Sequence, residues 1–160
     1  MAALENNTVY MTLDSRGVPG TFHWGVFVTS STEGRYYHAT NSSGGWQLEV
    51  RPTSSIMSSS TLVLAYKIGQ VSSQSQIDQV LRDVPADGSP SLRTGEAFTC
   101  RIWAKDAVMA LYNNRLLDLS ADIDTLEREA IRLVTKFEPD VERGVRQATV
   151  MDSTSSSSSS

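Results

Sequence analysis

The residues of this chain that could do nucleophilic chemistry are few. Its 160 residues include one cysteine, Cys100, and two histidines, His23 and His38. A cysteine attacks a carbonyl group as its thiolate, and a neighbouring imidazole can take the thiol proton. A second polar group behind that imidazole fixes which of its ring nitrogens carries a proton. The chain therefore holds the residue types for a thiol nucleophile, its base and an orienting partner.

Both histidines lie in segments with the alternation of β-strands. The segment TFHWGVFV holds its most apolar side chains on one face, so His23 projects from the other face, where Gly25 leaves space. Polar residues over 29–34 predict a hairpin turn, and the returning strand over 35–40 carries His38. The two histidines can therefore be neighbours across a strand pair.

Cys100 lies at the first turn of a predicted helix that starts near Thr99. The inward face of this helix is an apolar stripe of Cys100, Trp103, Ala104, Ala107, Val108 and Leu111. A cysteine on such a stripe is often a small core residue. The N-terminus of a helix, however, carries partial positive charge, which favours a thiolate over a thiol. A thiol at a helix start and two histidines on paired strands are what a papain-type thiol site requires.

The elements around these residues predict an α+β domain. The first half of the chain reads as an antiparallel meander of four or five strands, of which the last is a buried run over 61–68. The second half has helical periodicity and predicts three helices. The third follows Ser120 and ends before Pro139, and its charged residues, Glu127 among them, predict a solvated face. We expect the small sheet to pack against the helix that carries Cys100.

Composition and charge indicate how the chain is organised and which partners it lacks. Residues 1–144 predict a single catalytic-type domain, and residues 145–160 predict a disordered, serine-rich tail that brings no apolar surface to a core. A formal charge of -4 argues against nucleic acid as a partner. No apolar run is long enough to span a membrane, and no signal segment opens the chain. A single cysteine fits a cytoplasmic location, and the oligomeric state stays open.

The order and context of these motifs resemble a known superfamily. HWGVFV, then YYHAT one hairpin later, then FTCRIWAKDAVMAL at a helix start, are similar to the circularly permuted NlpC-type superfamily of papain-like enzymes. The similarity is to its lecithin:retinol acyltransferase-like branch. It implies a papain-like permuted core with Cys100 as nucleophile, His23 as general base and His38 as its orienting partner. Thr99 stands where that branch usually has asparagine, which leaves the substrate class open.

The residues and the resemblance together predict a thiol-dependent hydrolase or acyltransferase. His23 would deprotonate Cys100, and the thiolate would attack a small-molecule acyl or amide substrate to form a thioester acyl-enzyme. Water would resolve this intermediate in a hydrolase, and an amine or alcohol in a transferase. Should His38 point away from the cleft, Asn41 and Gln47 are the alternative third members.

Other readings of the same residues stay open. One is a non-catalytic binding module on the same fold, which recognises a small molecule or a protein. Another is a tailoring or cyclising enzyme of small-molecule biosynthesis. No cofactor is implied, and a metal site is not expected, because the chain has no close ligand pair such as His-x-x-x-His.

Overall fold

The computed structural model describes residues 5–15, 22–30, 34–41, 44–53, 62–71, 74–119, 121–142 and 149–152. These residues form an α+β fold with one sheet and three helices. The strands are β1 (Thr8–Ser15), β2 (Phe22–Thr29), β3 (Gly34–Thr40), β4 (Gln47–Thr53), β5 (Leu62–Gln70) and β6 (Thr149–Asp152). The helices are α1 (Gln74–Asp83), α2 (Cys100–Asn113) and α3 (Ile123–Glu142).

The strands lie in the order β4-β3-β2-β1-β5-β6. β1 to β4 form the predicted antiparallel meander. β5 does not extend it, because this strand returns to the far side of β1 and pairs with it antiparallel. The physical reason is burial: β5 is almost wholly apolar, and a place beside the buried β1 covers it. β4 is left as an edge strand, where Pro52 costs no hydrogen bond of a central ladder.

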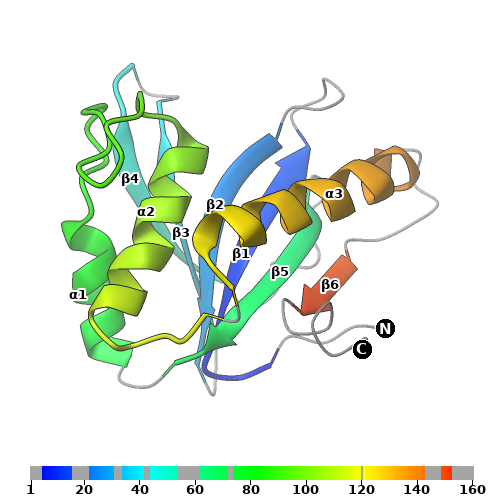
Figure 1. Ribbon diagram of the computed structural model, residues 1–160, viewed down its shortest axis with the longest axis horizontal. Coiled ribbons are helices and arrows are strands. Elements are labelled where there is room, and N and C mark those ends of the chain that lie inside the picture. The colour runs from blue at the N-terminus through cyan, green and yellow to red at the C-terminus, as the bar shows by residue number, and fades with distance from the viewer. Residues whose placement is uncertain are drawn as a thin grey trace.

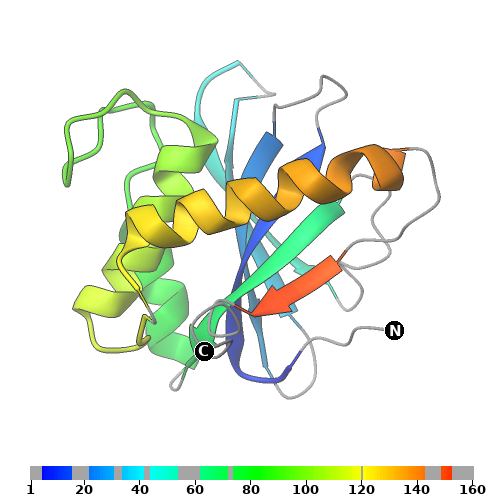
Figure 2. The ribbon, with the colours of Figure 1, turned by 45° about the vertical axis from the view of Figure 1, so that its right-hand side comes forward.

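All three helices lie on one face of the sheet (Figures 1 and 2). α2 packs against β2 and β3, α3 packs against β5 and β1, and α1 packs against α2. The core between the helices and the sheet includes the fully buried side chains of Met11, Val26, Trp103 and Val134. Burying a side chain of this size contributes about 1.5–3 kcal/mol. None of these three helices has a stretch long and apolar enough to cross a bilayer.

The opposite face of the sheet carries a smaller aromatic cluster that includes Tyr10, Phe27 and Tyr36. Two of its rings lie over glycines of the neighbouring strand. A Cβ at Gly25 would stand 2.6 Å from the ring of Tyr36, and a Cβ at Gly34 would collide with the ring of Phe27. The space that the sequence predicts beside Gly25 is therefore filled by Tyr36, which holds the aromatic rings against this face.

β6 corrects the prediction of a disordered tail over 145–160. This short strand runs parallel to β5, where Val150 pairs with Ala65. Val150 also packs against the aromatic cluster, so four residues of the tail bring enough apolar and backbone contact to add a strand. The structural unit thus extends beyond residue 144. The serine run lies outside the described residues.

Two expectations for the third helix are also wrong. α3 continues through Pro139 to Glu142: the proline removes one hydrogen bond and crowds the carbonyl four residues before it, but only three helical residues follow it. The charged face is not fully solvated either. Glu127 is 8% exposed and receives hydrogen bonds from Lys105 and Arg101 of α2. The sequence pattern of this helix identifies Glu127 as charged, but it does not show that Lys105 of another helix lies buried against it.

Candidate active site

The two histidines contact each other. Nε2 of His23 in β2 lies 2.7 Å from Nδ1 of His38 in β3, at hydrogen-bond distance. The rings meet edge to face, with centroids 4.9 Å apart. His38 is 8% exposed, and His23 is half-buried. The prediction that these histidines are neighbours across a strand pair is confirmed.

The strands that carry the histidines part at this place. The β2–β3 ladder ends at the pair Val26–Tyr37, although β2 begins at Phe22 and β3 continues to Thr40. Strand alternation puts both imidazoles on the face of Tyr36, away from the helices. The β2–β3 pairing therefore stops short of the histidines, while His23 still pairs with Asp14 of β1 and His38 with Glu49 of β4.

Glu49 of β4 is the second partner of His38. Its carboxylate accepts a hydrogen bond from Nε2 of His38, and the two residues are direct partners in the β3–β4 ladder. Arg51 stands 3.7 Å from the same carboxylate, and its guanidinium lies 5.7 Å from the centroid of the Tyr36 ring. His38 is thus bonded at both ring nitrogens, to an imidazole on one side and to a carboxylate on the other.

Sequence reasoning missed Glu49 and named Asn41 and Gln47 as alternative third members. The signal was present in the alternation of β4, which puts Glu49 on the polar face together with Gln47 and Arg51. What the sequence lacks is the register of the hairpin, which sets Glu49 opposite His38.

Tyr36 covers the other side of His38. The two rings stack with centroids 4.6 Å apart and planes inclined by 25°. Burial raises the pKa of the Tyr36 hydroxyl above its usual range, and the negative charge of Asp14 adds to the rise, while Arg51 opposes it. Tyr36 therefore lies between His38 and the charged groups of this face of the sheet.

Cys100 is the first residue of α2 and is 4% exposed. The predicted helix start is confirmed, because the Thr99 hydroxyl accepts a hydrogen bond from the backbone N–H of Ile102 at 3.1 Å. α2 packs against β2 and β3, and Cys100 belongs to the core on the helix side of the sheet. The thiol thus lies at the positive end of a helix that covers the two histidine strands.

The start of α2 lies at the same end of the sheet as the histidines. Phe98, which precedes Cys100 by two residues, meets Trp46 edge to face at 4.8 Å between ring centroids. Trp46 directly precedes β4, and β3 ends beside the start of β4 with the pair Thr40–Gln47. One end of the sheet therefore carries the start of α2 with its thiol on the helix side, and the imidazole pair with the Glu49 carboxylate on the opposite face.

This arrangement has the parts for proton transfer and for stabilising an anion. An imidazole that is bonded to a second imidazole and a carboxylate can accept a proton, because positive charge on the pair is offset by the carboxylate. Backbone N–H groups at the start of α2 are donors for a developing oxyanion. Within the described part of the chain, no three His, Cys, Asp or Glu side chains gather closely enough to hold a metal ion.

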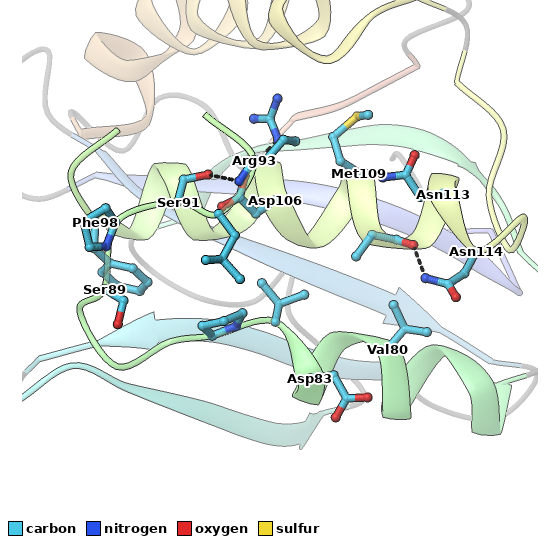
Figure 3. A pocket seen from close by; sticks show the side chains of 15 residues that line it. Val80, Asp83, Ser89, Ser91, Arg93, Phe98, Asp106, Met109, Asn113 and Asn114 are labelled. Carbon is cyan, nitrogen blue, oxygen red and sulfur yellow. Dashed lines mark hydrogen bonds and ion pairs between the residues drawn. The ribbon is translucent and has the colours of Figure 1, made fainter. Parts of the chain in front are cut away.

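A cavity of about 340 Å³ lies elsewhere, between α1, α2 and the segment that joins them (Figure 3). Phe98 and Met109 contribute to its apolar lining, and the ion pair of Arg93 with Asp106, at 3.0 Å, lies beside it. Neither Cys100 nor a histidine lines this cavity. It is a separate feature from the thiol and imidazole groups.

A family of unknown function, DUF6540, matches residues 9–118. The chain belongs to this family. The matched residues extend from β1 to just beyond α2, and they include His23, His38, Glu49 and Cys100, whereas α3 and β6 lie outside them. A search of curated proteins finds no match. A search of solved structures finds no match either.

Proposed function

We propose that this chain is a thiol-dependent hydrolase or acyltransferase in which Cys100 is the nucleophile and His23 the base. The observation that carries the proposal is the 2.7 Å contact between His23 Nε2 and His38 Nδ1 at the end of the sheet where α2 begins. Burying two imidazoles costs desolvation free energy that two apolar side chains of similar size would not cost, so packing alone does not explain the pair. The resemblance to the permuted NlpC-type enzymes supports the same roles for these residues.

The proposed reaction proceeds in two stages. The proton of the Cys100 thiol moves to His23, and the thiolate attacks the carbonyl carbon of a small-molecule acyl or amide substrate. The oxyanion accepts hydrogen bonds from backbone N–H groups at the start of α2. The imidazolium then protonates the leaving alcohol or amine, and a thioester remains on Cys100. Water releases the acid in a hydrolase, and an amine or alcohol takes the acyl group in a transferase.

The test is the formation of the acyl-enzyme itself. The protein is incubated with small esters, thioesters and amides of varied acyl groups, and its intact mass is measured. We expect wild type to gain the mass of one acyl group with at least one class of compound. Cys100→Ala should gain none, because it has no other cysteine, and Cys100→Ser is the near-isosteric control for folding.

Two results would contradict the proposal. One is an adduct that persists in Cys100→Ala, which would place the nucleophile elsewhere. The other is a folded wild-type protein that forms no adduct with any of the compound classes. His23→Ala separates the role of the base, because this variant keeps the thiol and should form the adduct much more slowly.

The cavity beside α2 favours a second candidate function, the binding of a small apolar molecule without catalysis. Its volume of about 340 Å³ falls within the range of ligand pockets, which is roughly 300–1,000 Å³. Apolar compounds that raise the melting temperature of wild type should lose this effect in Met109→Trp, which fills the cavity, and keep it in Cys100→Ala. Equal shifts in all three proteins would place the ligand elsewhere.

A further inference from the structure

The His38 ring has a different kind of partner at each nitrogen. Nδ1 meets Nε2 of His23 at 2.7 Å, and Nε2 meets the Glu49 carboxylate. A neutral imidazole has one N–H and one lone pair, so these partners decide which nitrogen carries the proton. We propose that Glu49 is a positioning residue that fixes the tautomers of both histidines and thereby assigns Nδ1 of His23 as the base. The last step of this inference, toward the thiol, rests on the proposed function.

The tautomers can be assigned in order along the hydrogen bonds that join Glu49 to His38 and His38 to His23. A carboxylate accepts hydrogen bonds and donates none, so Nε2 of His38 must carry the proton that points at Glu49. Nδ1 of His38 then holds a lone pair and accepts a hydrogen bond. The donor of that bond is Nε2–H of His23. In the neutral pair, the remaining lone pair of His23 therefore lies on Nδ1.

Proton transfer along this chain balances without any other reactant. The Sγ–H bond of Cys100 breaks, and an Nδ1–H bond forms on His23. The Nε2 proton of His23 then crosses the existing 2.7 Å contact to Nδ1 of His38. His38 becomes an imidazolium that donates to His23 on one side and to Glu49 on the other. The positive charge thus lies one ring away from the thiolate, beside a carboxylate.

The burial of the groups explains why a carboxylate stands at the end of this chain. His38 is 8% exposed, and an imidazolium there lacks the water that would stabilise its charge. Glu49 has a side chain that is 46% exposed, so it supplies negative charge at little desolvation cost. The other charged groups nearby are Asp14, the β1 partner of His23, and Arg51, which stands 3.7 Å from the Glu49 carboxylate. The Cys100 thiol belongs to the core on the helix side of the sheet.

Nitrogen NMR of the intact protein tests the tautomers directly. The chain has two histidines, so ¹⁵N-histidine labelling of a protein without a histidine tag gives four ring nitrogens to assign. Protonated and lone-pair nitrogens are well separated in ¹⁵N chemical shift. At neutral pH we expect Nε2–H for both rings in wild type. Glu49→Leu should turn His38 into a tautomer mixture, and Asp14→Asn should leave His38 as Nε2–H.

An Nδ1–H tautomer at either ring of the neutral wild-type pair would overturn the inference, and so would a His38 that is unchanged in Glu49→Leu. A change of the His38 tautomer in Asp14→Asn would also overturn it, since the outer carboxylate would then be Asp14.

Alkylation of Cys100 on the same samples separates this inference from the proposed function. If NMR shows the predicted tautomers but the Cys100 thiol is not alkylated, the role of Glu49 stands and the proposed function is contradicted. We expect Glu49→Leu to slow alkylation at neutral pH about tenfold, the lower end of the loss seen when a metal-bound histidine loses its hydrogen-bond partner.

Discussion

At the scale of single residues, Cys100 and His23 should act as one unit. Cys100→Ala removes the nucleophile and His23→Ala removes its base, so each should lower turnover of an adduct-forming substrate roughly 10³-fold or more. The double variant should be no worse than the more severe single variant, because either change alone abolishes the acyl-enzyme route. Turnover and urea unfolding of the three proteins provide the measurement. Losses that multiply, or a loss of stability that accounts for the loss of turnover, would contradict the assignment.

Gly25 should be intolerant of even a methyl group. Its Cβ would stand 2.6 Å from the Tyr36 ring, which stacks on His38. Gly25→Ala should therefore lower the free energy of unfolding by about 1–3 kcal/mol, the usual cost of overpacking. Gly45→Ala is the matched control, since no atom lies within 4 Å of its Cβ position. Urea unfolding of both variants checks this, and equal stabilities would show that Tyr36 moves aside freely.

At the scale of elements, Asp78 ties α1 to β3. Its carboxylate accepts a hydrogen bond from the Tyr37 hydroxyl at 2.7 Å and one from Arg82 at 2.8 Å. Burial would raise the pKa of Asp78, but the bonds from Tyr37 and Arg82 outweigh it, and the pKa lies below its usual value. Asp78→Asn should therefore cost about 1–3 kcal/mol of stability at neutral pH.

The sign of its pH dependence follows from the lowered pKa. The stability that the ionised Asp78 contributes is fully present above the ordinary aspartate pKa of about 3.9, and it is lost as the pH falls through the lower folded value. The difference between wild type and Asp78→Asn should thus shrink in acid. Asp83→Asn, on the same helix, is the control and should stay within about 0.5 kcal/mol of wild type. A pH-independent difference would contradict the role of the charge.

The elements also show what the sequence could and could not predict. Alternation was enough to put His23 and His38 on one face of a strand pair, and an apolar stripe was enough to start a helix at Thr99. Alternation does not say which strand a strand pairs with, so the return of β5 beside β1 was missed. The same holds for Glu49, whose partnership with His38 depends on hairpin register.

At the scale of the whole molecule, α3 is joined to the part that matches DUF6540 by a buried ion cluster. Lys105 of α2 is 3% exposed and donates to Glu127 and Asp124 of α3 at 2.8 Å each. Glu127→Gln removes the negative charge that faces the Lys105 ammonium and the Arg101 guanidinium. It should therefore lower the free energy of unfolding by about 3 kcal/mol or more. Glu129, on the same helix, is half-buried and pairs with the exposed Arg132, so Glu129→Gln should cost less than about 1 kcal/mol. Similar urea midpoints would show that apolar packing alone docks α3.

The end of the chain should divide into two parts with different effects on stability. Removing 153–160 should leave the melting temperature unchanged, because a run of serines brings no apolar area. Removing 149–160 also deletes β6 and the contact of Val150 with the aromatic cluster. This longer deletion should lower the melting temperature by about 2–4 °C for each kcal/mol lost. Calorimetry distinguishes them, and two equal melting temperatures would contradict a structural role for β6.

The central claim is that His23 activates Cys100, and the rate of iodoacetamide alkylation against pH tests it most directly. Iodoacetamide reacts with the thiolate, and an ordinary thiol becomes reactive near its pKa of about 8.5. We expect folded wild type to be alkylated rapidly in neutral solution, and His23→Ala to lose this reactivity while it stays folded. Two results would contradict this claim: a folded wild-type protein that is not alkylated, or an alkylation rate with the same pH dependence in wild type and in His23→Ala. Either would show that Cys100 is only a packing residue of the core.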